Sequence, residues 1–272
     1  MSWIEALGLA RNPFRDTLET DLFFRTEQHE AALVRLRIGI EDRHALILLS
    51  GPSGSGKTLL AQVALREADR ARMAPALVFV HPGMGKGELL AALLRELGRK
   101  TGGRTVAERL AAVQEAALAF HHQGRQLVIV IDEAHFLASD ALHVLRTLAN
   151  LETETTKLTT VLLIAETPIL KRLAHPSYAA IRGRITFAVQ LGPLSAADTE
   201  QYIKYRLLKC KAPLSLVNGQ AFATAHQLAG GLPRQINRLL YNACVEALSA
   251  GSRAITPEIL SRAAGAMGHG PA

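Results

Sequence analysis

The stretch Gly51-Pro-Ser-Gly-Ser-Gly-Lys-Thr58 fits the P-loop pattern of phosphate-binding proteins at every required position. It lies between a short apolar run, Ala45–Leu49, and a helical stretch, Leu59–Arg70. Its glycines allow the backbone to turn back on itself, so that successive N–H groups point at phosphate oxygens, and the following helix adds the positive end of its dipole. The alternative is a glycine-rich turn without phosphate chemistry, and the strand and helix beside the motif count against it.

We expect this loop to bind ATP and Mg²⁺. Lys57 should reach the β- and γ-phosphates, and the Thr58 hydroxyl should help to hold Mg²⁺. The expected ATP contacts in and beside the loop are Gly51, Pro52, Ser53, Gly54, Ser55, Gly56, Lys57, Thr58 and Leu59.

A second motif, Leu127-Val-Ile-Val-Ile-Asp-Glu133, ends an apolar run in two carboxylates. In a parallel sheet both would lie at the carboxyl edge, where ligands bind. Asp132 should bind Mg²⁺ through water, and Glu133 should orient and polarise the attacking water, which predicts a hydrolase. The alternative is a strand that runs into an acidic helix start. His135 completes the letters Asp-Glu-Ala-His, but no other helicase motif follows, so we interpret it as an ordinary residue of the first turn.

Short apolar runs alternate with helical stretches from Ala45 to about residue 192. Because the runs are apolar throughout, as strands covered on both faces are, the predicted fold class is α/β: a P-loop parallel sheet with helices on both faces. After Gly192 only helical patterns remain, beginning with a capping box at Ser195 and Asp198. We therefore predict an N-terminal linker and helix (1–44), a nucleotide-binding core (45–192) and a small all-helical lid domain (193–272). The predicted strands are Ala45–Leu49, Ala76–Val80, Leu127–Ile131 and Thr160–Ala165.

The composition is that of a globular, basic chain. Of 272 residues, 49% are hydrophobic and 20% are charged, which excludes disordered and collagen-like classes. No apolar run approaches the roughly 18 residues of a membrane span, and no signal peptide is evident. Cys210 and Cys244 lie far apart, so we expect a cytoplasmic protein without a disulfide framework or a zinc site. The net charge of +7 and the pI of 9.7 favour a polyanionic partner.

Over nearly its whole length the chain resembles the ExeA/GspA-like family of AAA+ ATPases. The resemblance depends on the two phosphate motifs together with four further groups of residues. These are Leu7-Gly-Leu-Ala-Arg-Asn-Pro-Phe14; Asp132–Leu137 with Leu145-Arg146, Asn150–Thr153 and Lys157; Ile181-Arg-Gly-Arg-Ile185; and Gly230-Gly-Leu-Pro-Arg-Gln-Ile-Asn237.

The resemblance implies roles for residues outside the two motifs. Sensor 1 should be Thr167 or Glu166, where the family commonly has Gly-Gln. Arg234 should be sensor 2 and reach the γ-phosphate; a merely solvated cation would be disfavoured by the helix dipole in that first turn. Arg182 and Arg184 lie where such proteins carry the arginine finger, which completes the ATP site of a neighbouring subunit. We favour Arg182 as the finger and Arg184 as a structural residue, and hence a homo-oligomer, either a ring or a filament.

Two further residues, Phe14 and His81, are candidates for roles that the sequence leaves open. Phe14 is expected either to contact the adenine or to anchor the N-terminal segment through its apolar ring. His81 follows the second predicted strand, where many AAA+ proteins have an Asn that restrains the catalytic Glu, and it is a candidate for that role.

The first functional hypothesis is an ATPase similar to the transposition helpers of the Mu B, TniB and TnsC type. These bind double-stranded DNA as ATP-dependent rings or filaments and present a target to a transposase. Candidate DNA contacts are Lys86 in one loop, and Lys157 or Arg146 near the next. We expect both loops to follow core strands, on the face that AAA+ rings turn to their channel. The alternative for each residue is an ordinary solvated side chain.

The second hypothesis is a cytoplasmic ATPase of a secretion or pilus-assembly system, as in the founding members of the family. Those members typically add a transmembrane helix and an envelope domain, and neither is evident in this sequence. A third is a signalling ATPase that acts on a protein partner and whose basic charge is incidental.

Overall fold

The computed structural model describes residues 3–69, 71–100 and 105–268. Arg70, the predicted end of the first core helix, lies outside these residues. The chain forms two units. One consists of Glu27–Pro52 and Leu60–Leu191, and the other of Met1–Thr26, Ser53–Leu59 and Gly192–Ala272.

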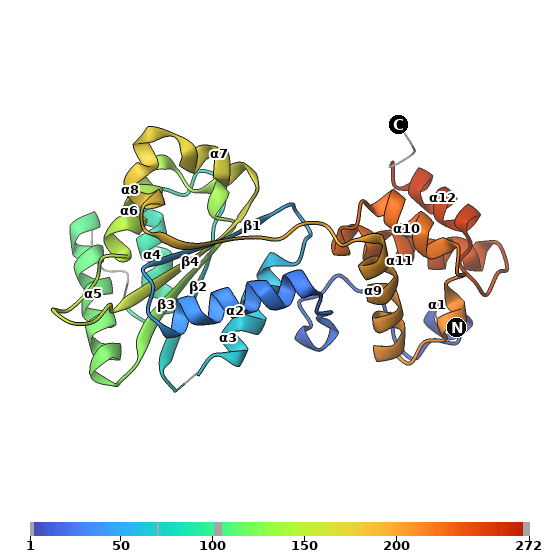
Figure 1. The fold of residues 1–272 in the computed structure, drawn as a ribbon, viewed down its shortest axis with the longest axis horizontal. Coiled ribbons are helices and arrows are strands. Elements are labelled where there is room, and N and C mark those ends of the chain that lie inside the picture. The colour runs from blue at the N-terminus through green and yellow to red at the C-terminus, as the bar shows by residue number, and fades with distance from the viewer. Residues whose placement is uncertain (1–2, 70, 101–104, 269–272) are drawn as a thin grey trace. The chain divides into compact units, whose positions relative to one another are not determined.

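A five-stranded parallel sheet forms the centre of the first unit (Figure 1). The strand order is β2-β3-β4-β1-β5. All four predicted strands are present, which confirms the α/β fold class with its parallel sheet. The strands are β1 (Leu46–Gly51), β2 (Met73–Phe79), β3 (Gln126–Asp132), β4 (Thr159–Glu166) and β5 (Ile185–Gln190).

The fifth strand, β5, was not predicted from the sequence. It pairs with β1 at one edge of the sheet, and of its residues only Val189 is buried. Since an edge strand is only partly covered, its side chains need not form the continuous apolar run that marks the central strands.

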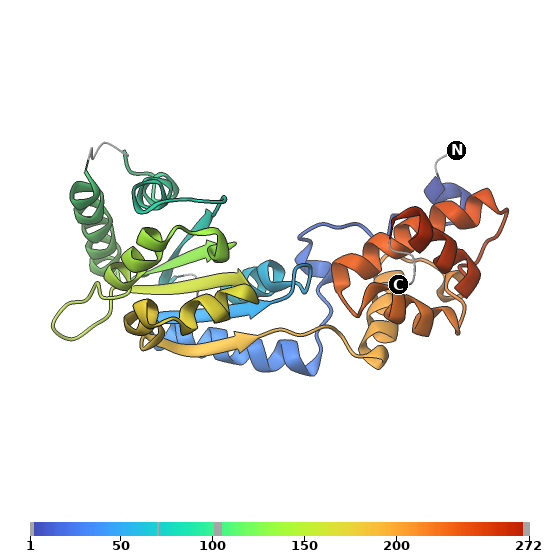
Figure 2. The ribbon, with the colours of Figure 1, turned by 90° about the horizontal axis from the view of Figure 1, so that it is seen from above.

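Helices cover both faces of this sheet (Figures 1 and 2). On one face, alternate strand residues such as Leu48 and Ile129 share a core with buried side chains of helices α4 to α8, such as Leu142. On the other, α2 packs so closely that a Cβ at Gly39 would lie 2.4 Å from Cδ1 of Ile47 on β1. The helical elements from α2 to α8 are α2 (Glu27–Glu41), α3 (Lys57–Glu67), α4 (Lys86–Glu96), α5 (Val106–His122), η2 (Ala134–Phe136), α6 (Ser139–Leu148), α7 (Pro168–Ala174), η3 (Pro176–Tyr178) and α8 (Ala179–Arg182).

The second unit is helical in its described C-terminal part, as predicted. The Ser195 hydroxyl accepts the Asp198 N–H at 3.0 Å, so the predicted cap begins the helix. One core unites buried residues of the C-terminal helices, such as Leu240, with Leu9 and Phe14 of the N-terminal segment. The elements are α1 (Trp3–Ala6), η1 (Thr20–Leu22), α9 (Ala196–Lys209), η4 (Leu214–Leu216), α10 (Ala221–Ala229), α11 (Pro233–Ser249) and α12 (Pro257–Ala266).

A buried arginine, Arg206 on α9, fixes the N-terminal segment to this unit. Its Nε donates to the Pro13 carbonyl at 2.5 Å and its Nη2 to the Arg15 carbonyl at 2.7 Å. Its Nη1 donates to the Tyr202 hydroxyl at 3.2 Å, and that hydroxyl donates to Asn237 Oδ1 on α11 at 2.9 Å. Burial raises the pKa of Tyr202 above its usual range, so the phenol stays neutral and keeps the hydroxyl hydrogen that it donates to Asn237.

Gly231 precedes α11 at a point where no other residue fits. Its φ is +69°, and a Cβ there would lie 2.3 Å from the carbonyl oxygen of Leu194. The Leu194 N–H in turn donates to the Gly231 carbonyl at 2.8 Å, which holds the two backbones together.

We expect Gly231→Ala to lower the free energy of unfolding by about 2–4 kcal/mol, because left-handed strain and a backbone clash add together. Gly251→Ala is the matched control: its φ is +65°, but a Cβ there would meet no atom within 4 Å. This control should lower the free energy of unfolding by only about 1 kcal/mol. Urea denaturation measures both, and equal losses would show that the approach to Leu194 is unimportant.

Candidate nucleotide-binding and hydrolysis site

The P-loop follows β1 directly, and α3 begins at its lysine. Lys57 is 7% exposed, and Ser55 is 2% exposed. Among the described residues, the Ser55 hydroxyl is the buried side-chain oxygen that has no hydrogen-bond partner. A buried hydroxyl that lacks a partner, beside a buried lysine, suits a loop that receives an anion, because burying a polar group without a partner is costly.

Within the second unit, the loop touches the start of α11. The Arg234 N–H donates to the Gly54 carbonyl at 3.2 Å. Gly54 has a φ of +75°, and a Cβ there would lie 2.7 Å from the Arg234 Cβ. The Arg234 Nε lies 3.4 Å from Asp16 Oδ2, and both side chains are more than half exposed. The predicted sensor 2 residue therefore lies against the P-loop, in an exposed ion pair that costs little to break.

Phe14 is buried, at 2% exposure, in the core that contains Leu9. Its N–H donates to Asn12 Oδ1 at 2.8 Å, which fixes the turn before it. Phe14 and Arg234 also line a cavity of about 460 Å³. The burial supports the anchoring alternative, and the adenine contact stays a prediction.

The second motif ends β3 as expected. Asp132 is 3% exposed, and its Oδ1 accepts the Glu133 N–H at 2.9 Å. Glu133 has φ 58° and ψ 35°, the left-handed conformation that residues other than glycine rarely adopt. This backbone strain costs of order 1–3 kcal/mol and is typical of functional sites.

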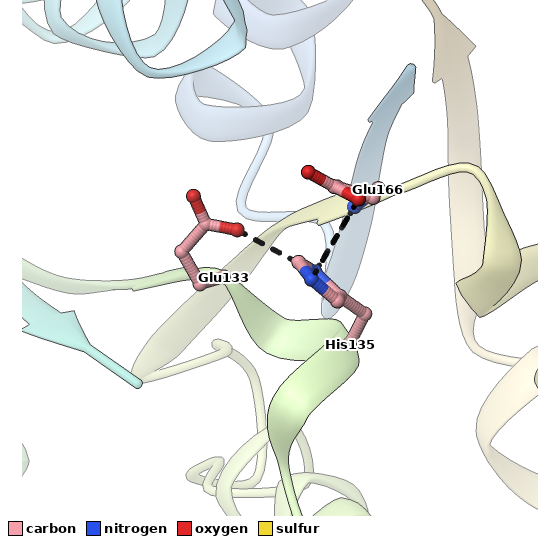
Figure 3. A group of neighbouring side chains, drawn as sticks. All are labelled: Glu133, His135 and Glu166. Atoms are coloured by element: carbon pink, nitrogen blue, oxygen red, sulfur yellow. Dashed lines mark hydrogen bonds and ion pairs between the residues drawn. The ribbon is translucent and has the colours of Figure 1, made fainter. Parts of the chain in front are cut away.

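His135 lies between two glutamates (Figure 3). Its Nδ1 is 3.5 Å from Glu133 Oε2, and its Nε2 is 4.0 Å from Glu166 Oε2. The backbone N–H of Glu166 donates to Nδ1 at 3.2 Å. Ligand atoms of these three side chains all lie within 4.8 Å of one another, which is close enough to hold a metal ion. From the sequence, His135 was interpreted as an ordinary residue of the first turn, but the structure places it against both glutamates. His81, the predicted restraint on Glu133, instead has Pro82 and Glu88 as its partners.

The two sensor 1 alternatives occupy different places. Glu166 is the last residue of β4 and contacts His135. Thr167 is exposed and precedes α7. Of the two alternatives, Glu166 is therefore the residue whose side chain lies close to those of Glu133 and His135.

The two candidate finger arginines are held differently. The exposed Arg182 donates its Nη1 to the carbonyls of Leu173 at 2.9 Å and Ala174 at 3.0 Å. Arg184 is half-buried and donates its Nε to the Asn150 side chain at 2.7 Å. Of the two, Arg182 is the more exposed.

The candidate DNA contacts do not share one surface, contrary to expectation. Lys86 is exposed at the start of α4, after the carboxyl end of β2. Arg146 lies near the end of α6, where the Leu148 carbonyl accepts the hydroxyl of Thr159, the first residue of β4. Lys157 lies two residues before the start of β4 and is paired with Glu152. Because the strands are parallel, the second group lies at the amino edge of the sheet, opposite Lys86.

Comparison with known proteins gives one family match and several similar proteins. Residues 40–173 match the family model described as the AAA domain. General secretion pathway protein A of Aeromonas hydrophila is 30% identical over 265 residues, which cover 96% of this chain and 48% of that protein. The chain thus spans about half the length of this relative.

Solved structures share the fold. Cdc6p from Pyrobaculum aerophilum has a TM-score of 0.75 at 18% identity, covering 93% of this chain and 70% of that one. Drosophila ORC bound to DNA has a TM-score of 0.72 at 17% identity, covering 96% of this chain and 65% of that one. The fold is that of P-loop AAA+ proteins, and the residues that match the AAA domain model make up just under half of this chain. Over nearly its whole length, the chain is similar to General secretion pathway protein A.

The strain at Glu133 can be measured. We expect Glu133→Gly to raise the free energy of unfolding by about 1 kcal/mol, because glycine adopts the left-handed conformation without steric cost. Glu133→Gln keeps the strain and should leave stability within about 0.5 kcal/mol of the original. Urea denaturation gives both values, and a glycine variant no more stable than the glutamine variant would contradict the strain.

Proposed function

We propose that this chain hydrolyses ATP as a homo-oligomer and binds double-stranded DNA when ATP is bound, as a helper of a transposase. The ATPase part rests on one observation: Glu133 has a left-handed backbone and lies beside the buried Asp132. Both residues lie at the end of β3, which runs parallel to β1, the strand that leads into a complete P-loop.

Each residue has a chemical task in this proposal. The backbone from Gly51 to Gly56 and the Lys57 ammonium bind the phosphates, and Glu133 polarises the attacking water. Thr58 and Asp132 would hold Mg²⁺, Asp132 through water, and both offer the oxygen ligands that this ion prefers. When bound, the ion neutralises charge on the β- and γ-phosphates.

The arginine finger requires a second copy of the chain. An exposed Arg182 fits a group that acts on the neighbouring ATP site, where its charge stabilises the transition state. Arg184 is held by Asn150, which fits a structural role.

Arg182→Ala should retain ATP affinity and lose turnover by about 10³-fold or more, as expected for a finger. Arg253→Ala removes an exposed arginine of the helical unit and is the matched control, with turnover unchanged. Phosphate release and fluorescent-nucleotide binding measure the two properties. Full turnover in both Arg182→Ala and Arg184→Ala would remove the finger from the proposal.

Charge and relatives support DNA as the partner. The net charge is +7, and a structure with the same fold is Drosophila ORC bound to DNA. Lys86 is the best candidate for a phosphate contact, because it is exposed at the start of α4, whereas Lys157 is neutralised by Glu152.

Binding to random-sequence duplex DNA, with and without a non-hydrolysable ATP analogue, tests this part. We expect affinity only with the analogue, falling with salt by a log–log slope of about −0.9 for each phosphate contact. Lys86→Ala should make that slope shallower by about 1, and Lys157→Ala should change it less. No binding at low salt would exclude the DNA role.

A second candidate is an ATPase of a secretion or pilus-assembly system. The observation that favours it is the identity of 30% with General secretion pathway protein A over 96% of this chain. Among the described residues, no helix is long and apolar enough to cross a membrane. An ATPase that turns over without responding to DNA would favour this candidate.

A further inference from the structure

We propose that His135 is a positioning residue for Glu133: its Nδ1 pairs either with the backbone N–H of Glu166 or with the Glu133 carboxylate, and this choice decides whether Glu133 is free to polarise water. The proposal rests on the proposed role of Glu133 in hydrolysis. It adds a side chain, two residues along the chain from Glu133, that connects this base to the end of β4.

The backbone around His135 is fixed from α7. Arg172 Nη1 donates to the carbonyl of His135 at 3.3 Å and to the carbonyl of Leu137 at 2.6 Å. The imidazole itself is 11% exposed and lies against the Phe136 ring, with 4.1 Å between ring centroids. Because the side chain has little room, its Nδ1 stays in reach of both glutamates.

One nitrogen cannot serve both partners. A neutral imidazole carries one N–H, so Nδ1 is either an acceptor or a donor. When it accepts the Glu166 N–H, at 3.2 Å, it has no hydrogen for the carboxylate of Glu133, 3.5 Å away. When it carries a hydrogen, it donates to that carboxylate, whose oxygen is then engaged by the imidazole and is not free to orient a water molecule.

Glu166 connects the hydrogen-bond choice of His135 Nδ1 to β1, the strand that leads into the P-loop. Glu166 ends β4, in register with Gly51 at the end of β1. A small shift of the β4 end that withdraws its N–H from Nδ1 would allow Nδ1 to take up a hydrogen and pair with Glu133. His135 therefore couples the general base to the position of the β4 end.

Three variants test the inference through kinetics. His135→Phe keeps the ring bulk and removes both nitrogens, so the Glu166 N–H loses its acceptor and Glu133 is no longer positioned relative to the end of β4. We therefore expect kcat to fall about tenfold to a hundredfold, with KM and nucleotide affinity unchanged. His135→Asn places an oxygen near the Nδ1 position, which still accepts the Glu166 N–H, so kcat should stay within about threefold of the original. The control, His143→Asn, changes an exposed histidine on α6 and should change nothing. Equal losses in the Phe and Asn variants, or none in the Phe variant, would overturn the proposal.

A second measurement does not depend on turnover. The ¹⁵N shifts of the His135 ring report which nitrogen carries hydrogen, in the full chain with and without a non-hydrolysable ATP analogue. We expect them to differ between the original chain and Glu133→Gln, whose amide is a weaker acceptor. Identical shifts in both chains would overturn the positioning role even if ATP is hydrolysed. Absent turnover with a shift difference would instead count against the proposed ATPase function alone.

Discussion

The parallel hydrogen-bond ladder of the sheet is the constraint on which the site depends. It places Gly51 beside Glu166 and Phe79 beside Asp132, so that polar ends of different strands meet at one edge. A slip of one residue would turn every side chain to the opposite face. Since helices pack on both faces, such a slip would disrupt two cores at once, and the register is therefore strongly specified.

Two residues with proposed roles depart from the arrangement that would be most stable. Glu133 adopts a left-handed backbone that glycine would tolerate better, and Ser55 keeps a buried hydroxyl without a partner among the described residues. Departures from local preference of this kind are expected where function requires them. His135 belongs to the same group, because its Nδ1 faces two groups and can satisfy one at a time.

Much of this was predictable, and the exceptions have physical reasons. The central strands were evident because both of their faces are buried, and Ser195 marked a helix start through a local hydrogen bond. The edge strand β5 was not, since it is mostly exposed. The contact of His135 with Glu166 spans 31 residues and uses a backbone N–H, which no residue pattern encodes. The separation of Lys86 from Arg146 and Lys157 likewise depends on α6 returning to the far edge of the sheet, which spacing along the chain does not reveal.

The hydrogen bonds of Arg206 to the N-terminal segment limit how far the protein can be shortened at that end. It is buried, and its acceptors include the main-chain oxygens of Pro13 and Arg15, which no substitution can remove. Deleting the first fifteen or so residues would remove those oxygens and leave a cation enclosed without them, a penalty of several kcal/mol. The helical unit therefore cannot be trimmed at its amino end without also replacing a side chain nearly two hundred positions downstream.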